Sequence, residues 1–468
     1  MGKNVTVLGL GIEGVDVVRY LATHGASVTV SDAKSPEELS ARITELDGLP
    51  VRFSLGGNRV DDAVSADLLM VSQGVPLTLP AVAAARERGI PISSMTRLFL
   101  ELCPAVVVGI TGSSGKTTTT ALVGAMFAAA GRKHVVGGNI GVGLLGLLEC
   151  ITPETWVVLE ISHSQLEMAG RSPHIACVLN VTPNHLDRYT WEEYIALKLR
   201  ILQAQKRDDV AVLNLEDEVT CSFATETPAR IVWFSSRRVP NGDAAAYLRE
   251  GSLIWRQGSV ETKLLSVDEV PLRGAHNVEN VLAAIAIACS AGLESDAVAR
   301  AIRQFTPVPH RLELVAAVNG VSYYNDSIAT TPERALAGLR SYQEPVVLLL
   351  GGREKHLPVE DLAQEAAERC RAVVCFGEAG PLLDEAVSYA SGQAGRDLPI
   401  ERVETVEDAV EAARQHARPG DVVLLSPACA SYDAYASFEE RGEDFRRIVR
   451  GLAAKGGNAP SQSPRRAR

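Results

Sequence analysis

The sequence predicts an α/β protein of three domains with mostly parallel sheets. The chain has 468 residues, and at roughly 100 to 200 residues per domain it should divide into about three. Short apolar runs alternate with stretches of helical periodicity, which is typical of strand–helix–strand units. Two of these runs, ending near Leu8 and Ile110, lead into glycine-rich loops that are followed by a helical pattern.

Composition and charge exclude several classes of protein. With 46% hydrophobic and 22% charged residues, the chain is close to the average of soluble globular proteins. The formal net charge of −11 argues against general affinity for nucleic acid. The eight cysteines include no C-x-x-C pair, which indicates neither a zinc site nor a disulfide framework. The most apolar helical stretch, 281–293, is too short to span a bilayer, and the N-terminus lacks a signal-peptide pattern, so we expect a cytoplasmic protein without membrane insertion.

The first domain is expected over residues 1–95. A strand at 4–8 leads through the turn GLGIEG into a helix, and a second strand follows at 27–31. Further strands are expected at 68–71 and just before Pro91. This order predicts a small Rossmann-like domain.

The second domain is expected over residues 96–307. Its apolar strands and its long buried helix are expected at 106–110, 156–159, 175–179, 210–214 and 278–291. The stretch from 234 to 271 shows short strands and turns and is expected to be a β insertion.

The third domain is expected over residues 308–456, after a hinge at 307–309, where two prolines can neither donate to a strand ladder nor continue a helix. Its strands, at 346–350, 372–376 and 422–426, alternate with helical segments, again a Rossmann-like pattern. The tail 457–468 is poor in apolar residues and is expected to be disordered.

The strongest chemical signal is the loop 111–117, with the sequence TGSSGKT. Backbone N–H groups of such a loop cradle phosphate oxygens, Lys116 adds a positive charge, and Thr117 can bind Mg²⁺. The strict P-loop pattern is not met, because Ile110 stands where the first glycine belongs and Gly109 comes one place early. The position between an apolar strand and a helix still predicts a P-loop-type ATPase domain rather than an ordinary glycine-rich turn.

The first glycine loop is a weaker signal. Gly9, Gly11 and Gly14 match the dinucleotide fingerprint, and Asp32 stands at the end of the second strand, where an acid that binds ribose is expected. A plain tight turn or a nicotinamide-dependent oxidoreductase would also explain these glycines. The phosphate loop beside it favours a UDP-type ligand.

Polar motifs follow the next strands of the central domain. GGNIG at 137–141, EISHSQLE at 160–167 and NVTPNHLD at 180–187 each come after an apolar strand. Ligands collect at the carboxyl ends of parallel strands, so Glu160 and His185 are candidates for a metal beside the phosphate loop. The alternative is a pair of solvated or capping side chains.

The motifs together resemble the Mur ligase family. They are TGSSGKT at 111–117, GGNIG at 137–141, NVTPNHLDRY at 180–189, GAHNVEN at 274–280, PHRLE at 309–313, NDS at 325–327 and SPACAS at 426–431. They occur in order over all three expected domains, and the resemblance covers residues 3–455. It is closest to the members that add D-glutamate to UDP-N-acetylmuramoyl-L-alanine in peptidoglycan synthesis.

The resemblance implies an ATP-dependent ligase that forms an amide bond and releases ADP and phosphate. The γ-phosphoryl group of ATP would activate the carboxylate of UDP-N-acetylmuramoyl-L-alanine as an acyl phosphate, and the amine of D-glutamate would attack it. The cofactor would be Mg²⁺, with two ions, and the enzyme would be a monomer without nucleic-acid partners. Phosphorylation is needed because a carboxylate is a poor electrophile.

The resemblance also assigns site residues. The catalytic set would be Lys116, Glu160, His185, Lys198, Arg311 and Asp326. ATP would be bound by Gly112, Ser113, Ser114, Gly115, Lys116, Thr117, Thr118, Asn280, Arg311 and Asp326. The UDP precursor would be bound by Ile12, Glu13, Asp32, Ser72, Gly74, Asn139 and Ser162, with Gln73 in the same turn. The metal ligands would be Thr117, Glu160, His185 and a carbamylated Lys198.

The amino acid would be bound by the third domain, through Thr330, Lys355, Ser431, Tyr432 and Phe438. Hydroxyls, N–H groups and a cation suit an amino acid that carries two carboxylates. Arg311 and Asp326 lie beyond the hinge and would reach ATP only when the third domain closes.

The sequence departs from the family pattern at three positions. Ile328 stands where the family motif DSKATN has a lysine that faces the acceptor, and Lys355 or another cation would have to compensate. Asn184 stands where an aspartate often precedes the histidine, and His163-Ser164 replaces a common Ser-Phe pair. His163 would either replace the lost aspartate or be a structural histidine.

Three alternatives follow from these observations. A related Mur or folylpolyglutamate-type ligase with a different acceptor would account for Ile328, although the Asp-Asn-Pro-Arg motif of the ligase that adds a diamino acid is absent. The oxidoreductase leaves Lys116 without a role. A non-catalytic nucleotide-binding module would show no ATP hydrolysis stimulated by substrate.

Overall fold

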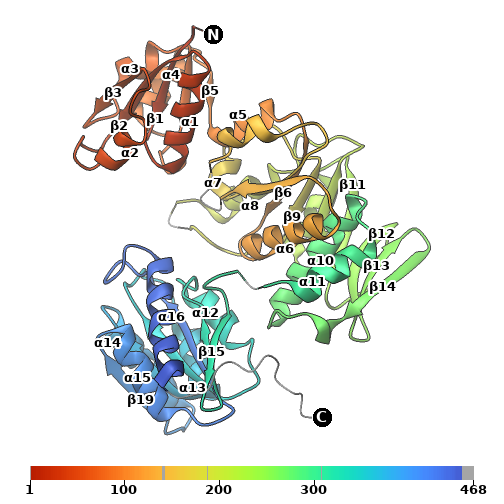
Figure 1. The fold of residues 1–468 in the computed structure, drawn as a ribbon, viewed down its shortest axis with the longest axis vertical. Helices are drawn as coiled ribbons and strands as arrows, with labels where there is room; N and C mark the ends of the chain where they lie inside the picture. Colours follow the sequence, from red (N-terminus) through yellow and green to blue (C-terminus); the bar gives the residue numbers. More distant parts are fainter. Residues whose placement is uncertain (1, 140–142, 187, 307, 456–468) are drawn as a thin grey trace. The chain divides into compact units, whose positions relative to one another are not determined.

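The structure, a computed structural model, describes residues 2–139, 143–186, 188–306 and 308–455 (Figure 1). It divides into two compact units, Met1–Val270 with Val278–Phe305, and Pro271–Asn277 with Thr306–Arg468. The first unit holds two sheets and the second unit holds one. Pro307 of the expected hinge and the tail 457–468 lie outside the described residues.

The first sheet is wholly parallel, with the strand order β3-β2-β1-β4-β5. Its elements are β1 (Asn4–Leu8), α1 (Ile12–Thr23), β2 (Ser27–Asp32), α2 (Ser40–Thr44), β3 (Val51–Leu55), α3 (Val60–Val64), β4 (Leu68–Val71), α4 (Pro80–Glu87) and β5 (Ile92–Ser93). The strand order reverses between β1 and β4, which is where open parallel sheets bind ligands. The Rossmann-like prediction is confirmed for this part of the chain.

The glycine loop after β1 is built for close approach. Gly9 has a φ of +88°, and a Cβ on Gly14 would lie 2.2 Å from the carbonyl oxygen of Gly9. Gly14 is therefore required by packing between the loop and α1, and Gly9 by its left-handed backbone and by its contact with Val75, where a Cβ would lie at 2.8 Å. The expected last strand was misplaced: it follows Pro91, because a proline has no N–H to donate and only its carbonyl pairs, with the Leu69 N–H at 2.9 Å.

The second sheet has the order β14-β13-β12-β11-β10-β9-β6-β8-β7. Its strands and helices are α5 (Met95–Leu102), β6 (Val106–Thr111), α6 (Lys116–Ala129), β7 (His134–Gly138), η1 (Leu145–Cys150), β8 (Trp156–Glu160), α7 (His163–Leu166), β9 (Ile175–Val178), α8 (Trp191–Leu199), β10 (Val210–Asn214), α9 (Glu218–Ser222), η2 (Phe223–Thr225), β11 (Arg230–Ser235), β12 (Ala244–Arg249), β13 (Ser252–Gln257), β14 (Val260–Ser266), η3 (Val267–Glu269), α10 (Ala275–Ser290) and α11 (Ser295–Gln304).

This sheet is parallel from β7 to β12, and β13 and β14 are antiparallel additions at its edge. The prediction of a mostly parallel central sheet is confirmed, and the expected β insertion extends the same sheet. In α10, residues 281–288 are all fully buried, which explains why that stretch is apolar on every side.

The third sheet has the order β15-β16-β20-β17-β18-β19. Its elements are β15 (Glu313–Val318), β16 (Val321–Asn325), α12 (Pro332–Leu339), β17 (Val346–Gly351), α13 (Glu360–Arg369), β18 (Cys370–Phe376), α14 (Gly380–Gln393), β19 (Ile400–Val403), α15 (Val406–His416), β20 (Val422–Ala428) and α16 (Phe438–Lys455). Five strands are parallel, and β15 pairs with β16 in an antiparallel hairpin. The sequence reading missed this hairpin, because β15 is an edge strand with only Val318 buried.

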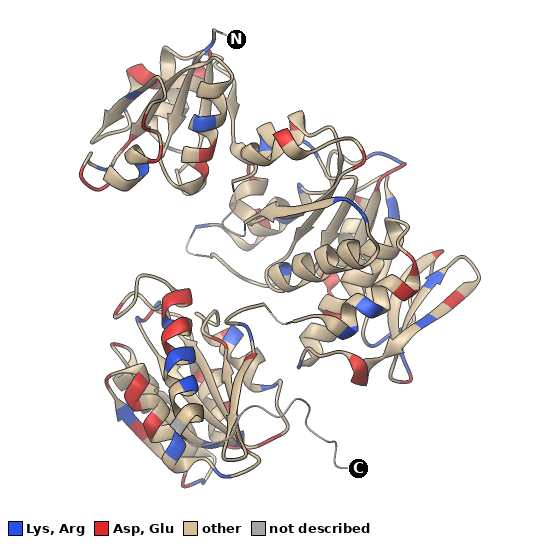
Figure 2. Cartoon of the chain, in the orientation of Figure 1, with Lys and Arg blue, Asp and Glu red and all other residues tan. Residues whose placement is uncertain are grey.

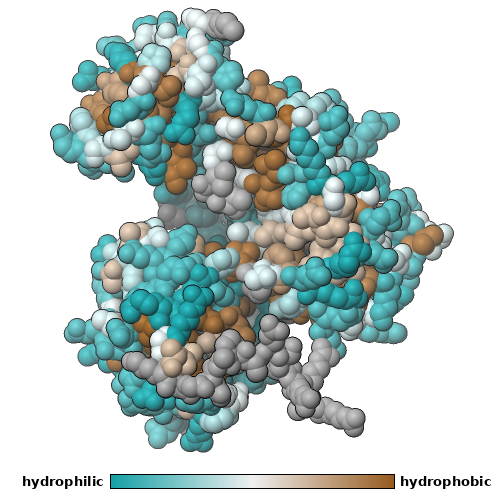
Figure 3. All heavy atoms as spheres, viewed as in Figure 1, coloured by the Kyte–Doolittle hydropathy of each residue, from teal (hydrophilic) through white to brown (hydrophobic). Residues whose placement is uncertain are grey.

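Charged groups of both signs are mixed over the helices, for example along α16, and hydrophilic residues cover most of the face drawn in the space-filling view (Figures 2 and 3). This mixture suits a chain whose anionic ligands depend on local sites rather than on a field of one sign. Among the residues that the structure describes, every helix is too short or too polar to cross a bilayer.

Candidate active site

The phosphate loop joins β6 to α6 and is fixed by the segment after the neighbouring strand β9. Asn180 accepts the N–H of Ser113 on its carbonyl oxygen at 3.0 Å and the N–H of Ser114 on Oδ1 at 2.9 Å. The Ser113 hydroxyl donates to the Thr182 carbonyl at 3.0 Å. Gly109 lies inside β6, where a Cβ would meet the Pro173 ring at 2.3 Å. Gly109 is therefore needed for the packing of β6. This explains why a glycine stands one place before the first glycine position of the P-loop pattern.

Gly115 places the loop against Asn280 of α10. It has a φ of +81°, and a Cβ there would lie 2.2 Å from Asn280 Oδ1. The structure thus brings Asn280 against the phosphate loop. Thr117 is half-buried in the first turn of α6, and Thr118 is buried behind it.

We expect Gly115→Ala to raise the KM for ATP about 10- to 100-fold, because the new Cβ displaces Asn280 and shifts the loop. Gly131→Ala is the matched control: Gly131 also has a positive φ, +65°, but a Cβ there would meet no described heavy atom within 4 Å. Both changes carry a left-handed strain of about 1 kcal/mol. Equal KM values for ATP in the two variants would contradict this account.

Two lysines converge on one carbonyl of the loop. Lys116 Nζ donates to the Gly112 oxygen at 2.9 Å, and Lys198 Nζ of α8 donates to the same oxygen at 3.0 Å and to Thr111 Oγ1 at 3.2 Å. Lys198 is 1% exposed. Burial, together with the charge of Lys116, holds the pKa of the Lys198 amine well below its ordinary value, while Glu160 acts in the opposite direction. The structure therefore places Lys198 in the site as a buried amine with a strongly lowered pKa.

Glu160 ends β8 next to the loop and is 2% exposed. Its Oε1 accepts from Asn139 Nδ2 at 3.0 Å, and its main-chain oxygen accepts from the Asn139 N–H at 2.9 Å. Its buried Oε2 has no hydrogen-bond partner among the described residues. A buried carboxylate oxygen without a donor suits a metal ion.

His185 follows β9 with a positive φ of +56° and stacks on His163 of α7, with ring centroids 4.0 Å apart. Burial, followed by the charges of His185 and Lys198, lowers the pKa of His163 to about 3. His163 is thus a neutral ring against the face of His185. Its buried Nε2 has no hydrogen-bond partner within the described ranges.

The expected metal ligands lie around the phosphate loop, but few of them are carboxylates or histidines. Within the described ranges, His, Cys, Asp and Glu side chains form no group of three that could hold a metal ion. Glu160 and His185 supply two such side chains, and Lys198 becomes an anionic oxygen ligand only if it is carbamylated. The donor set fits Mg²⁺ when that group, Thr117 and nucleotide phosphates complete it.

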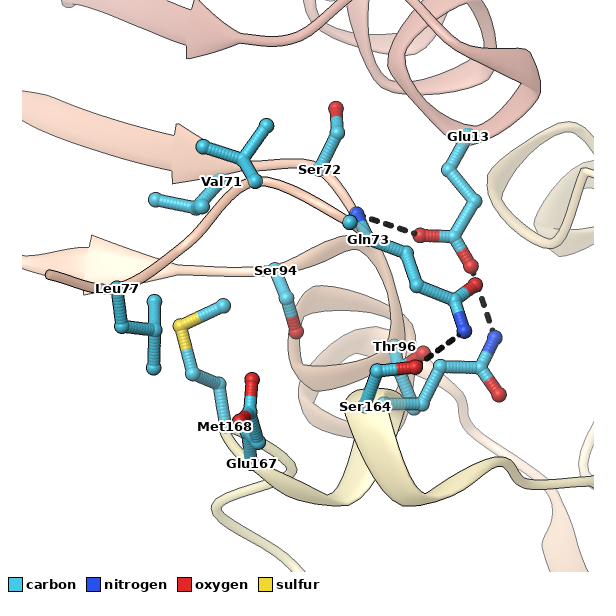
Figure 4. Close-up of a pocket in the computed structure, with 13 residues that line it drawn as sticks. Glu13, Val71, Ser72, Gln73, Leu77, Ser94, Thr96, Ser164, Glu167 and Met168 are labelled. Atoms are coloured by element: carbon cyan, nitrogen blue, oxygen red, sulfur yellow. Dashed lines mark hydrogen bonds between the residues drawn. The ribbon is translucent and has the colours of Figure 1, made fainter. Parts of the chain in front are cut away.

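Four of the residues expected to bind the precursor lie where the first sheet meets the central one: Glu13, Ser72, Gly74 and Ser162. Glu13 of α1 accepts from Gln165 Nε2 of α7 at 2.8 Å and from the Gln73 N–H at 3.4 Å. Gln73 Nε2 in turn donates to Ser162 Oγ at 2.7 Å. The same nitrogen donates to Ser164 Oγ at 2.5 Å (Figure 4). Burial raises the pKa of Glu13. The pocket beside this network is lined by Val71, Ser72, Gly74, Leu77, Ser94, Thr96, Glu167 and Met168.

Asp32 holds the glycine loop rather than standing free. Its carboxylate accepts the N–H of Leu10 at 2.7 Å and the N–H of Lys34 at 2.9 Å. Ser72 donates to the Gly9 carbonyl at 2.7 Å. Ile12 is 52% exposed at the start of α1, which leaves it available to a ligand.

Asp326, at the end of β16, is fully buried in the third domain. It accepts the N–H of Leu312 at 3.2 Å and the Ser426 hydroxyl at 2.8 Å. Burial raises its pKa to about 7, against the opposing effects of Ser426 and Arg311. Arg311 therefore lies near enough to Asp326 to act on its charge.

We expect Asp326→Asn to change how stability depends on pH. Because the folded pKa is raised above the unfolded value, the stability that Asp326 contributes is present below pH about 4 and is lost as pH rises through about 7. The loss amounts to up to about 4 kcal/mol. The melting temperature of the variant, relative to that of the wild type, should therefore be higher at pH 8 than at pH 5. The same difference between the two chains at both pH values would contradict the burial of this carboxyl.

Three of the expected amino-acid residues lie together at the carboxyl ends of β16, β17 and β20. Lys355 Nζ donates to Thr330 Oγ1 at 3.1 Å. The two loops are tied by an antiparallel bridge between Arg353 and Ala430, which brings buried Ser431 alongside. Phe438 begins α16 and accepts from Ser327 Oγ on its main-chain oxygen at 2.8 Å, whereas Tyr432 is 64% exposed.

Several polar contacts of the site were missed by sequence reasoning. The sequence assigns no role to Asn180, Tyr194 or Gln165, although Asn180 fixes the phosphate loop. The Tyr194 hydroxyl lies 3.2 Å from the Ser113 hydroxyl, and the Lys198 amine lies 5.3 Å from the centre of the Tyr194 ring. Asn180 and Gln165 lie within the polar motifs, so their position after a strand was an available signal. Tyr194 had no such signal, because only the packing of α8 brings it to the loop.

Three family models match the chain in succession. They are a Mur ligase MurD-like N-terminal domain over residues 3–94, a Mur ligase middle domain over 110–288, and a Mur ligase glutamate ligase domain over 310–429. The chain belongs to the Mur ligase family. All residues of the phosphate loop, together with Glu160 and Lys198, fall in the middle domain of this Mur ligase.

Relatives match the Mur ligase over nearly its whole length. A UDP-N-acetylmuramoylalanine–D-glutamate ligase of Symbiobacterium thermophilum is 45% identical over 96% of this chain and 98% of its own. The enzyme of the same name from Roseiflexus sp. is 42% identical over 96% of this chain and 98% of its own. That from Acetivibrio thermocellus is 38% identical over 97% of both chains.

Solved structures share the fold of the Mur ligase at low identity. The UDP-N-acetylmuramate-alanine ligase MurC of Thermotoga maritima has a TM-score of 0.60 at 20% identity, and covers 97% of this chain and 100% of its own. A pseudomurein peptide ligase type C of Methanothermus fervidus has a TM-score of 0.58 at 17% identity with the same coverage. These likenesses support the three-domain α/β architecture.

Proposed function

We propose that the chain is an ATP-dependent ligase that joins D-glutamate to UDP-N-acetylmuramoyl-L-alanine in peptidoglycan synthesis. The observation that carries the proposal is the name shared by relatives that are 37% to 45% identical over about 96% of the chain. The site agrees with it, because a phosphate loop, two lysines and a buried carboxylate meet in the central domain.

The reaction balances in two steps. A carboxylate oxygen of the precursor attacks the γ-phosphorus of ATP, the bond to the β-phosphate oxygen breaks, and ADP leaves. The amine of D-glutamate then attacks the acyl carbon, phosphate leaves with the carboxylate oxygen, and the amine loses a proton. Lys116 neutralises charge on the transferred phosphoryl group, and the N–H groups of the loop 112–117 hold the phosphates.

Mg²⁺, when bound, offsets the phosphate charge and polarises the transferred group. We assign its binding to Thr117, Glu160, His185 and Lys198, the last as a carbamate, and propose that two ions bind. The unpartnered Glu160 oxygen and the lowered pKa of Lys198 support this assignment, because only a neutral amine reacts with carbon dioxide.

The third domain supplies the amino-acid site. We assign Thr330, Lys355, Ser431, Tyr432 and Phe438 to the acceptor, and Arg311 and Asp326 to the nucleotide. The hydrogen bond between Lys355 and Thr330, and the bridge that brings Ser431 to them, support a single acceptor site in this domain.

We assign the UDP precursor to Ile12, Glu13, Asp32, Ser72, Gly74, Asn139 and Ser162. The network around Glu13 and Gln73 supports the assignment of Glu13 and Ser162. We further propose that the enzyme acts in the cytoplasm, where ATP and UDP-linked precursors are available. We also propose that it acts as a monomer.

Phosphate release from ATP tests the function directly. The assay contains Mg²⁺ and UDP-N-acetylmuramoyl-L-alanine, with D-glutamate, L-glutamate, D-aspartate, L-lysine, meso-diaminopimelate or no acceptor. Stimulation by D-glutamate alone, with the amide product found by mass spectrometry, is the expected result. Stimulation by another acceptor would instead favour a related ligase with a different specificity, for which Ile328 is the motivating observation. No stimulation by any acceptor would contradict ligase activity.

A further inference from the structure

The third domain lacks one cation that its family uses at the acceptor. Ile328 stands where the family motif has lysine. It is half-buried, and its N–H donates to the His310 carbonyl at 3.2 Å. An acceptor with two carboxylates therefore has only Lys355 among the residues assigned to it above to meet its negative charge. A second positive group is needed close to Lys355 and Thr330.

Arg334 is a positive residue close to Thr330 in the chain. It lies in the first turn of α12, four residues after Thr330, and its N–H donates to the Thr331 carbonyl at 3.1 Å. Gly338 is four residues further, and a Cβ there would lie 2.8 Å from Asp326 Oδ2 and 3.1 Å from Ser426 Oγ. Residues four apart share one helix face, so Arg334 lies on the face of α12 that looks onto Asp326.

The charge of Arg334 acts on Lys355 and on Asp326. Its side chain is half-buried, and its guanidinium makes no hydrogen bond or ion pair within the described part of the chain. Burial and then the charge of Arg334 lower the pKa of Lys355, and the same charge opposes the raised pKa of Asp326. The two cations are thus neighbours that repel each other, as expected of a pair arranged to hold an anion.

We propose that Arg334 is the second cation for the carboxylates of the acceptor amino acid, and that it replaces the lysine lost at Ile328. The inference rests on the proposed function. A guanidinium binds a carboxylate with two parallel hydrogen bonds, which a lysine cannot do, so the exchange also changes the geometry of recognition. Contact with a phosphate of ATP is the competing role, because Asp326 is assigned to the nucleotide.

Steady-state kinetics of Arg334→Met test the proposal in the full chain. The KM for D-glutamate should rise about 10- to 100-fold through the loss of charge-assisted hydrogen bonds. The kcat value and the KM values for ATP and the precursor should stay close to those of the wild type. Arg450→Met, which removes an exposed arginine of α16, is the matched control and should change none of these constants.

A second variant separates binding from structure. In Ile328→Lys/Arg334→Met the family lysine returns, and the KM for D-glutamate should fall again by about 10-fold or more. Arg334→Met should also lose the preference for D-glutamate over D-glutamine or over D-isoglutamine, whichever lacks the carboxylate that Arg334 holds. If Arg334 had only a structural role, the KM for D-glutamate would not recover in the double variant and the preference for D-glutamate would not change.

The contrary outcomes are distinct. A rise in the KM for ATP in place of the KM for D-glutamate would overturn the inference and assign Arg334 to the nucleotide. Unchanged constants in Arg334→Met, or no recovery in the double variant, would also overturn it, while amide formation by the wild type would leave the proposed function standing. A wild-type chain that makes no amide from D-glutamate would overturn both.

Discussion

Replacing Lys116 with methionine is expected to lower kcat about 10²- to 10³-fold, the usual effect of removing one group that stabilises the charge of a transition state. Lys116 begins α6, and its amine already lies over the loop, 2.9 Å from the Gly112 oxygen and 3.3 Å from the Ser113 oxygen. Charge on the transferred phosphoryl group develops at this loop, so the effect should fall on kcat more than on the KM for D-glutamate.

Lys133→Met is the control for Lys116→Met. Lys133 is exposed beyond the end of α6, and its side chain bonds only to the Thr152 hydroxyl among the described residues, at 3.3 Å. Its loss should leave kcat unchanged. If Lys116→Met kept its melting temperature and most of its kcat, the loop 112–117 would not be the site of phosphoryl transfer.

Replacing Lys198 with alanine is expected to lower kcat about 10²-fold or more, because the loss of the proposed carbamate ligand and of a bond to the phosphate loop disturbs the binding of both metal and nucleotide. The buried position of Lys198 and its lowered pKa point to a neutral amine that can take up carbon dioxide. The wild-type chain supplied with ¹³C-labelled bicarbonate should show a carbamate signal by ¹³C NMR. A small carboxylic acid such as propionate should restore part of the activity of Lys198→Ala.

Lys206→Ala is the matched control, since Lys206 is an exposed lysine shortly after α8. It should keep both the carbamate signal and the activity. A carbamate signal that persists in Lys198→Ala, or a wild-type chain without that signal, would contradict the modification.

The parts of the site that the sequence predicts are those with local signals. The phosphate loop is recognisable because glycine, lysine and threonine stand at fixed spacing between a strand and a helix. Glu160 stands at the end of an apolar strand, and the parallel order β8-β6-β9 brings that strand end beside the loop. A strand-end residue can therefore be placed near a ligand before its neighbours are known.

Other parts depend on tertiary packing, which the sequence pattern does not encode. The edge strand β15 was not predicted and the short strand β5 was placed too early in the chain, since an edge strand is only partly apolar and β5 has two residues. The stacking of His163 on His185 joins residues 22 positions apart, because helix α7 packs against the segment after β9. The raised pKa of Asp326 likewise follows from burial beneath α12.

Isotope transfer from the precursor to phosphate tests the central claim most directly. The chain is given ATP, Mg²⁺, D-glutamate and UDP-N-acetylmuramoyl-L-alanine labelled with ¹⁸O in its alanyl carboxylate, and the released phosphate is weighed by mass spectrometry. The account predicts that each phosphate carries one labelled oxygen and that ADP, phosphate and amide form in equal amounts, because the carboxylate oxygen leaves with the phosphoryl group. Unlabelled phosphate, or phosphate released without amide, would contradict activation of the precursor as an acyl phosphate.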